Sequence, residues 1–193
     1  TQFGPLLSFT TPPQVPTVTT TPPTSLSATT GTFNGSANPN GSATTAWFRF
    51  STANPGVCND AFGTRVPATG GTAIPFGNSP VAFSQAVTGL TTGTTYYVCA
   101  IAQNSVGLNY GSVLTITTPG AATATTVLAS AITSSGATLN GTGNPNRADA
   151  TGWVRYSTTD PGTCDDTFGT RAPATGGSAL GNGTSAASYS QVV

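Results

Sequence analysis

Short runs of alternating apolar and polar residues recur along this chain, separated by Gly, Pro and Asn turns. In the clearest run, 95–104 (TYYVCAIAQN), one face carries Tyr96, Val98, Ala100 and Ala102, and Cys99 lies on the opposite face. Similar runs predict strands at 17–20, 29–36, 45–52, 81–88 and 111–118. No long apolar stripe has the helical period of 3.6 residues. The pattern therefore predicts an all-β fold of short strands.

The same pattern occurs twice, at an offset of 106 residues that relates Phe33 to Leu139. FNGSANPNGSATTAWFRFST at 33–52 matches LNGTGNPNRADATGWVRYST at 139–158, and FSQAV at 83–87 matches YSQVV at 189–193. An internal repeat of this length is a normal size for a β-sandwich domain. We therefore expect tandem copies of one β module.

The repeat also predicts where the domains begin and end. Residues 2–12 echo 109–119, so we expect 1–12 to be the last strand of a preceding repeat. Residues 13–119 would form one complete domain, and 120–193 a second repeat, truncated before its last two strands. Alternatively, Gln2–Thr11 completes the open sandwich of another copy by donor-strand addition. The Pro-rich joints are short, which favours a semi-rigid string of domains.

One stretch, LTTGTTYYVCAIAQNSVG from Leu90 onward, resembles the late strands of fibronectin type III domains. That family usually has Pro where Thr92 stands. The resemblance implies tandem immunoglobulin-like (fibronectin type III-like) β-sandwiches, in which a tyrosine corner at Tyr96 pins two strands. Arrays with NPNG, a Trp-Phe pair and L-x-x-G-T-x-Y-Y are typical of bacterial surface and secreted proteins.

In this topology the strands that carry Trp47 and Cys99 are neighbours, so the loop with Cys58 can reach Cys99 across the outer face. We therefore expect a Cys58–Cys99 disulfide. Cys164 repeats Cys58, and its partner is expected outside the chain. Disulfides favour an oxidising compartment, so an extracellular or cell-surface location is expected.

Two interpretations are open for the outer face of the 45–52 strand, which carries Trp47 and Arg49, and for its repeat, which carries Trp153 and Arg155. An exposed Trp beside an Arg is a platform for sugars or peptides. The favoured alternative is that the long segment 57–80 covers this face as a second small core. Its apolar side chains are Phe62, Ile74 and Phe76.

The sequence offers few residues that could support catalysis or bind a metal ion. The chain contains no His, and the acids of Asn59-Asp60 and Asp165-Asp166 offer too few oxygens for calcium. We expect these acids to serve turns, paired with Arg65 or Arg171, and we expect no enzyme, no metal and no cofactor. Four sequons are candidate glycosylation sites, although Asn-Gly is a common turn pair and a turn role is favoured: Asn34, Asn40, Asn140 and Asn182.

Charge is sparse: five Arg balance five Asp. Without a basic patch, neither nucleic-acid nor polybasic membrane binding is expected, and no apolar run is long enough for a membrane span. Together these features predict a structural or adhesive repeat protein of an extracellular or cell-surface fibre. Its partners would be neighbouring repeats or other copies of itself. The alternative is a spacer or carbohydrate-binding accessory module of a secreted polysaccharide-active enzyme; a receptor-like ectodomain is a third, weaker hypothesis.

Overall fold

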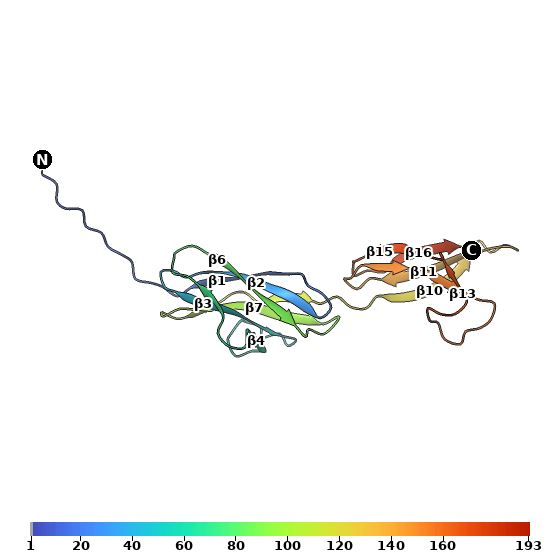
Figure 1. Ribbon diagram of the computed structural model, residues 1–193, viewed down its shortest axis with the longest axis horizontal. Helices are drawn as coiled ribbons and strands as arrows, with labels where there is room; N and C mark the ends of the chain where they lie inside the picture. The colour runs from blue at the N-terminus through green and yellow to red at the C-terminus, as the bar shows by residue number, and fades with distance from the viewer. Residues whose placement is uncertain (1) are drawn as a thin grey trace. The chain divides into compact units, whose positions relative to one another are not determined.

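The computed structural model describes residues 2–193, so residue 1 of the predicted segment 1–12 lies outside the described residues. Every regular element in this part of the chain is a β-strand (Figure 1), which confirms the predicted all-β class. The chain divides into two compact units. Unit 1 runs from the N-terminal segment to Leu90 and includes Thr95–Thr117; unit 2 comprises Thr91–Thr94 and Thr118–Val193. The predicted truncation of 120–193 stays a prediction.

The first sheet of unit 1 is antiparallel, in the order β1-β2-β6. Its strands are β1 (Thr17–Thr24), β2 (Thr30–Asn38) and β6 (Val81–Thr88). Burial alternates residue by residue along β2, so Phe33 and Ala37 face the core. The sheets approach closely at Gly35, where an added Cβ would lie 3.1 Å from the side chains of Ala100 and Phe83.

The second sheet is built around β3 (Thr44–Ser51) and β7 (Thr95–Gln103). β4 (Thr64–Val66) and β5 (Thr72–Ile74) pair with β3, and β8 (Leu108–Tyr110) and β9 (Leu114–Thr117) pair with β7.

The strand predicted at 111–118 is observed as β9 (Leu114–Thr117), which begins three residues later, because the chain turns aside at Gly111 between β8 and β9. Gly111 donates its amide to the Ala100 carbonyl at 2.8 Å. Its Cα lies so close to Thr20 that a Cβ would overlap it.

The main core lies between the two sheets of unit 1. Phe48 packs against Phe83 with ring centroids 4.9 Å apart, and Phe33 packs against Phe50 at 5.4 Å. Tyr96 is 6 % exposed and lies 5.9 Å from Phe50, ring to ring. Each fully buried aromatic side chain of this kind stabilises the fold by about 1.5–3 kcal/mol. Unit 1 is therefore a β-sandwich with an aromatic centre.

A tight turn follows β2. The Asn38 side chain accepts the amide of Asn40 at 3.1 Å, and Asn40 and Gly41 have positive φ values of 48° and 81°. Such values suit Asn and Gly, which is why an Asn-Pro-Asn-Gly stretch forms this turn. In unit 2 the same geometry places Arg147, with φ of 72°, where unit 1 has Gly41.

Unit 2 repeats the first sheet with β10 (Thr123–Ser130), β11 (Thr138–Asn144) and β16 (Ala187–Val192). Its other strands form two separate pairs. These are β12 (Ala150–Gly152) with β15 (Ser178–Gly181), and β13 (Val154–Tyr156) with β14 (Thr170–Ala172). β10 is exposed along its whole length, whereas its counterpart β1 buries Thr20.

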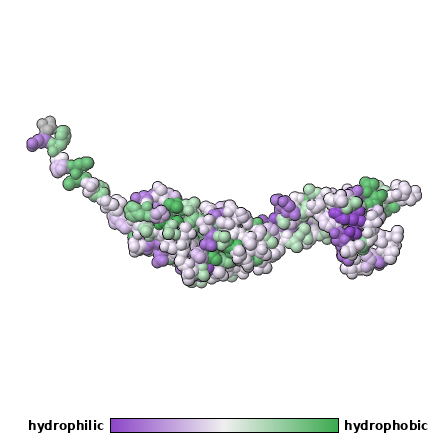
Figure 2. Space-filling view, in the orientation of Figure 1, coloured by the Kyte–Doolittle hydropathy of each residue, from purple (hydrophilic) through white to green (hydrophobic). Residues whose placement is uncertain are grey.

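Residues 2–12 are extended and belong to no sheet. Four large apolar side chains in this segment are 87–98 % exposed: Phe3, Leu6, Leu7 and Phe9. Figure 2 shows hydrophobic groups along it. Among the described residues, no helix is long and apolar enough to cross a membrane.

Candidate functional site

The outer face of β3 and β7 carries a second, smaller core. Trp47, Cys99 and Ile101 are at most 4 % exposed and form its centre. Trp47 lies opposite Ile101 in the strand register, and Arg49 lies opposite Cys99. Directly opposed residues project from the same face, so the alternation along each strand brings these side chains together.

The loop after β3 covers this face, but with fewer residues than predicted. Phe62 packs on the small core, whereas Ile74 belongs to the main core and Phe76 is 71 % exposed. The prediction for Ile74 and Phe76 is therefore wrong. Ile74 lies opposite Thr44 in the pairing of β5 with β3, and Thr44 is on the core side of that strand.

Cys58 and Cys99 form a disulfide with their Cα atoms 6.1 Å apart. It spans 41 residues of sequence and ties the loop to the middle of β7. These are the two cysteines for which the sequence predicts a bond. Cys164, the counterpart of Cys58, is free and exposed.

A network of polar contacts surrounds Trp47. Asp60 Oδ1 accepts hydrogen bonds from Trp47 Nε1 and from Arg49 Nε, both at 2.9 Å. Arg49 also donates Nη1 to the carbonyls of Phe62 and Gly63 at 3.2 Å.

Arg65 covers one face of the same indole, with its guanidinium carbon 4.4 Å from the ring centroid. It also donates to the carbonyls of Pro67 and Gly70. We call the four residues Trp47, Arg49, Asp60 and Arg65 the tryptophan clasp.

Unit 2 contains the same clasp, formed by Trp153, Arg155, Asp166 and Arg171. Asp166 Oδ1 accepts from Trp153 Nε1 at 2.9 Å and from Arg155 Nε at 2.8 Å. Arg171 lies over the indole of Trp153, 4.6 Å from its centroid. This copy is more open, because Trp153 is 37 % exposed whereas Trp47 is 4 % exposed.

The contacts in the second clasp lower the pKa of its aspartate, Asp166. The hydrogen bond from Arg155, and then that from Trp153, hold the pKa of Asp166 below its ordinary value of 3.8. The pKa of the neighbouring Asp165 is also lowered, chiefly by hydrogen bonds from the side chain and backbone of Thr167. Both carboxylates are therefore stabilised as anions.

The sequence-based pairing of these acids with Arg65 or Arg171 is wrong. Asp60 forms its ion pair with Arg49, and Asp166 forms its ion pair with Arg155. Arg49 lies two residues after Trp47 on the same face of β3, so both donors reach one carboxylate. The identical spacing of Trp, Arg and Asp in both repeats is the signal that could have revealed this contact.

The buried state of Trp47 argues against the platform interpretation in unit 1. One face of its indole lies under Arg65, and its N–H is bonded to Asp60. Trp47 and Arg49 thus hold the loop rather than present a surface. At Trp153 and Arg155 the indole remains partly open.

Three of the four sequon asparagines use their amide nitrogens within the fold. Asn34 donates to the Pro22 carbonyl at 3.0 Å, and Asn140 donates to the Leu128 carbonyl at 2.8 Å. Asn40 donates to the carbonyl of Val15 at 2.8 Å. Asn182 lies exposed outside any strand. The first three side chains therefore help to fix neighbouring segments.

Within residues 2–193, no group of three or more His, Cys, Asp or Glu side chains could hold a metal ion. No protein-family model, no curated protein and no solved structure matches this chain. Its function is therefore inferred from its own residues and its internal repeat.

Proposed function

We propose that this chain is a structural or adhesive repeat protein of an extracellular or cell-surface fibre, built from semi-rigid tandem fibronectin type III-like β-sandwiches. The observation that carries the proposal is the repetition of the tryptophan clasp. In both units a Trp, an Asp and two Arg residues at equivalent positions contact one another through hydrogen bonds and a cation–π contact. The two Arg residues also donate hydrogen bonds to loop carbonyls. The repeated polar residues thus serve the rigidity of the module.

Two further features support this proposal, one for the extracellular setting and one for association between copies. The Cys58–Cys99 disulfide is typical of proteins that fold in oxidising compartments. The chain has only five Arg and five Asp, so hydroxyl and amide groups provide most of its polar surface. Such a neutral surface has little long-range repulsion between copies, which suits lateral or end-to-end association.

The exposed segment Gln2–Thr11 is the feature best suited to contact other copies. Leu6 and Phe9 expose 98 % and 89 % of their surface, and apolar side chains on an extended segment favour addition to a sheet edge. Assembly through this segment would be head-to-tail, and a head-to-tail contact that does not close generates filaments.

Electron microscopy and analytical ultracentrifugation of the purified chain test the proposal. We expect beaded rods or filaments whose abundance rises with protein concentration. Deleting residues 2–11 should reduce assembly, whereas Asn182→Gln, at an exposed position outside the strands, should not. Isolated monomers at every concentration would contradict the fibre proposal.

A carbohydrate-binding accessory module is the second candidate. It is favoured by one observation: Trp153 and Tyr156 are 37 % and 40 % exposed in the same unit. Aromatic faces of this kind stack on sugar rings. Glycan-array binding that disappears in Trp153→Ala would support it, and uniform background on every glycan would remove it.

A further inference from the structure

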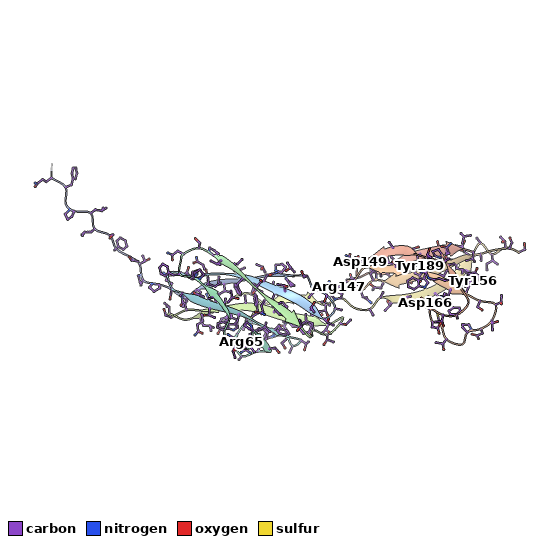
Figure 3. The ribbon with its side chains drawn as sticks, viewed as in Figure 1. Arg65, Arg147, Asp149, Tyr156, Asp166 and Tyr189 are labelled. Carbon is purple, nitrogen blue, oxygen red and sulfur yellow. A yellow bond between two sulfur atoms is a disulfide. The ribbon has the colours of Figure 1, made fainter. Side chains whose placement is uncertain are left out.

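Unit 2 has an open groove on the side of its short strands. β12 and β13 each pair with one strand, β15 and β14 respectively. Two hollows of about 650 Å³ and 270 Å³ lie beside them. Both are lined by Trp153, Arg155, Cys164 and Tyr189, and by Ala124 of β10. Figure 3 labels Tyr156, Asp166 and Tyr189, which come from separate segments of this unit.

Unit 1 shows what occupies the equivalent place. β3, the counterpart of β12 and β13, pairs with β7 from Thr45 to Ser51. β7 fills the core with Tyr96 and Val98, and it carries Cys99 on its other face. With β7 in place, Trp47 is 4 % exposed and Phe83, the counterpart of Tyr189, is 5 % exposed.

The exposed strand β10 suits the same kind of neighbour. In β1, the hydroxyl of Thr20 accepts the buried amide of Ala100 at 3.0 Å, which joins β1 to β7. The counterpart of Thr20 in unit 2 is Thr126, because Thr20 is paired with Gly35 and Thr126 with Gly141. Thr126 lies in a strand that is exposed at every position. Thr126 thus offers an exposed hydroxyl as an acceptor for a strand amide.

The charges of the groove favour an occupant without acidic side chains. Arg155 and Asp166 are already paired with each other at 2.8 Å. The segment Thr95–Thr117 of unit 1 contains no charged residue. The other charged residue that lines the hollows, Asp165, is an acid, so an occupant with a negative charge facing the groove would lack a counter-ion there.

We propose that unit 2 is an acceptor for an uncharged β segment with the chemistry of Thr95–Thr117, which in unit 1 forms β7, β8 and β9. Its first strand would lie along β13, and its cysteine would form a disulfide with Cys164. The counterpart pair is Cys58 and Cys99, whose Cα atoms are 6.1 Å apart. This inference goes beyond the proposed function, since it follows from the internal repeat and does not require fibre assembly.

The segment Gln2–Thr11 is a poorer occupant of the same groove. It matches Asn109–Thr118, which contains the end of β8 and all of β9, and these strands pair with β7 rather than with β3. It also contains no cysteine. It therefore provides a natural control for strand selectivity.

The test mixes the 193-residue chain with a synthetic peptide of residues 90–119, whose cysteine is protected as a mixed disulfide with glutathione. The Cys164 thiolate would attack the peptide sulfur, form the new S–S bond and release glutathione as its thiolate, which takes up a proton. Electrons and atoms balance without a further oxidant. Mass spectrometry should locate the adduct at Cys164, and hydrogen exchange should show protection of the β13 amides.

The decisive control is the same peptide with the positions of Val98 and Ala100 replaced by Asp. It has the same reactive disulfide but cannot pack its core face, so its adduct should form more slowly by on the order of tenfold or more. Equal rates would show only an exposed thiol and would overturn the proposal. Cys164→Ser should abolish the adduct and retain protection of β13. A peptide of residues 2–12 that protects β13 equally well would also overturn it.

Discussion

The guanidinium carbon of Arg65 lies 4.4 Å from the centroid of the Trp47 indole. Arg65 thus covers one face of the indole, while the indole N–H donates a hydrogen bond to Asp60. Trp47, a candidate binding platform from the sequence, therefore anchors the long loop that follows β3.

Arg65→Lys should weaken unit 1. Lysine cannot stack as a plane or donate to two carbonyls in a fixed fork, so we expect a loss of about 1 kcal/mol of unfolding free energy. Trp47 should become more exposed, which red-shifts its fluorescence. Denaturation in a Trp153→Phe background isolates this signal. Arg171→Lys in a Trp47→Phe background is the matched control. An equal effect there would contradict a role that depends on burial.

Thr20→Val should destabilise unit 1 without changing its shape. The substitution removes the hydroxyl that accepts the buried Ala100 amide at 3.0 Å, and a buried donor left without that acceptor costs about 1–3 kcal/mol. Chemical denaturation measures the change. Thr126→Val at the exposed counterpart in β10 should change stability by less than about 0.5 kcal/mol. Similar losses at both positions would refute the assignment.

Removing the disulfide should cost unit 1 much of its stability. The bond closes a loop over a sequence separation of 41 residues, for which the chain-entropy model gives about 4 kcal/mol. Unfolding of Cys58→Ser/Cys99→Ser, compared with Cys164→Ser as the control, tests this value. Unchanged unfolding of the double variant would show that the small core holds the loop unaided.

The clasp of unit 2 should loosen in acid. Since the folded pKa of Asp166 is lower than its ordinary value of 3.8, this carboxylate contributes stability above that pH and loses it as the pH falls through the folded pKa. Carbon-13 NMR titration of the carboxyl groups should show Asp166 titrating below 3.8. Arg155→Gln should raise its pKa, because Arg155 is the largest cause of the shift. No movement of the titration in that variant would contradict the assigned cause.

Arg147→Gly should stabilise unit 2. Arg147 has a φ of 72°, and a non-Gly residue in this region costs about 1–2 kcal/mol. Glycine adopts that conformation without strain. The backbone amide of Arg147 donates to the Gly183 carbonyl at 3.0 Å, and a glycine at this position keeps that amide. The gain should appear in denaturation followed by Trp153 fluorescence. Gly41→Arg, the reverse exchange in unit 1, should be destabilising.

Much of the fold is determined locally by the sequence. The period of two along a strand assigns Tyr96 and Val98 to one face and Cys99 to the other, whatever lies around them. The same local rule predicts β6 at Val81–Thr88 with its observed bounds. Positive φ at Asn40 and Gly41 likewise follows from residue type.

Only the tertiary structure decided which distant groups meet. The register of β5 on β3 places Ile74 in the main core, and the approach of Thr20 to β7 bends the chain at Gly111. The choice of Arg49 rather than Arg65 as the partner of Asp60 depends on where the loop crosses the outer face. Such contacts depend on the alignment of strands far apart in the chain. The alternation of residue types excludes a slip of one residue, which would exchange the two faces, but it does not distinguish alignments that differ by two residues.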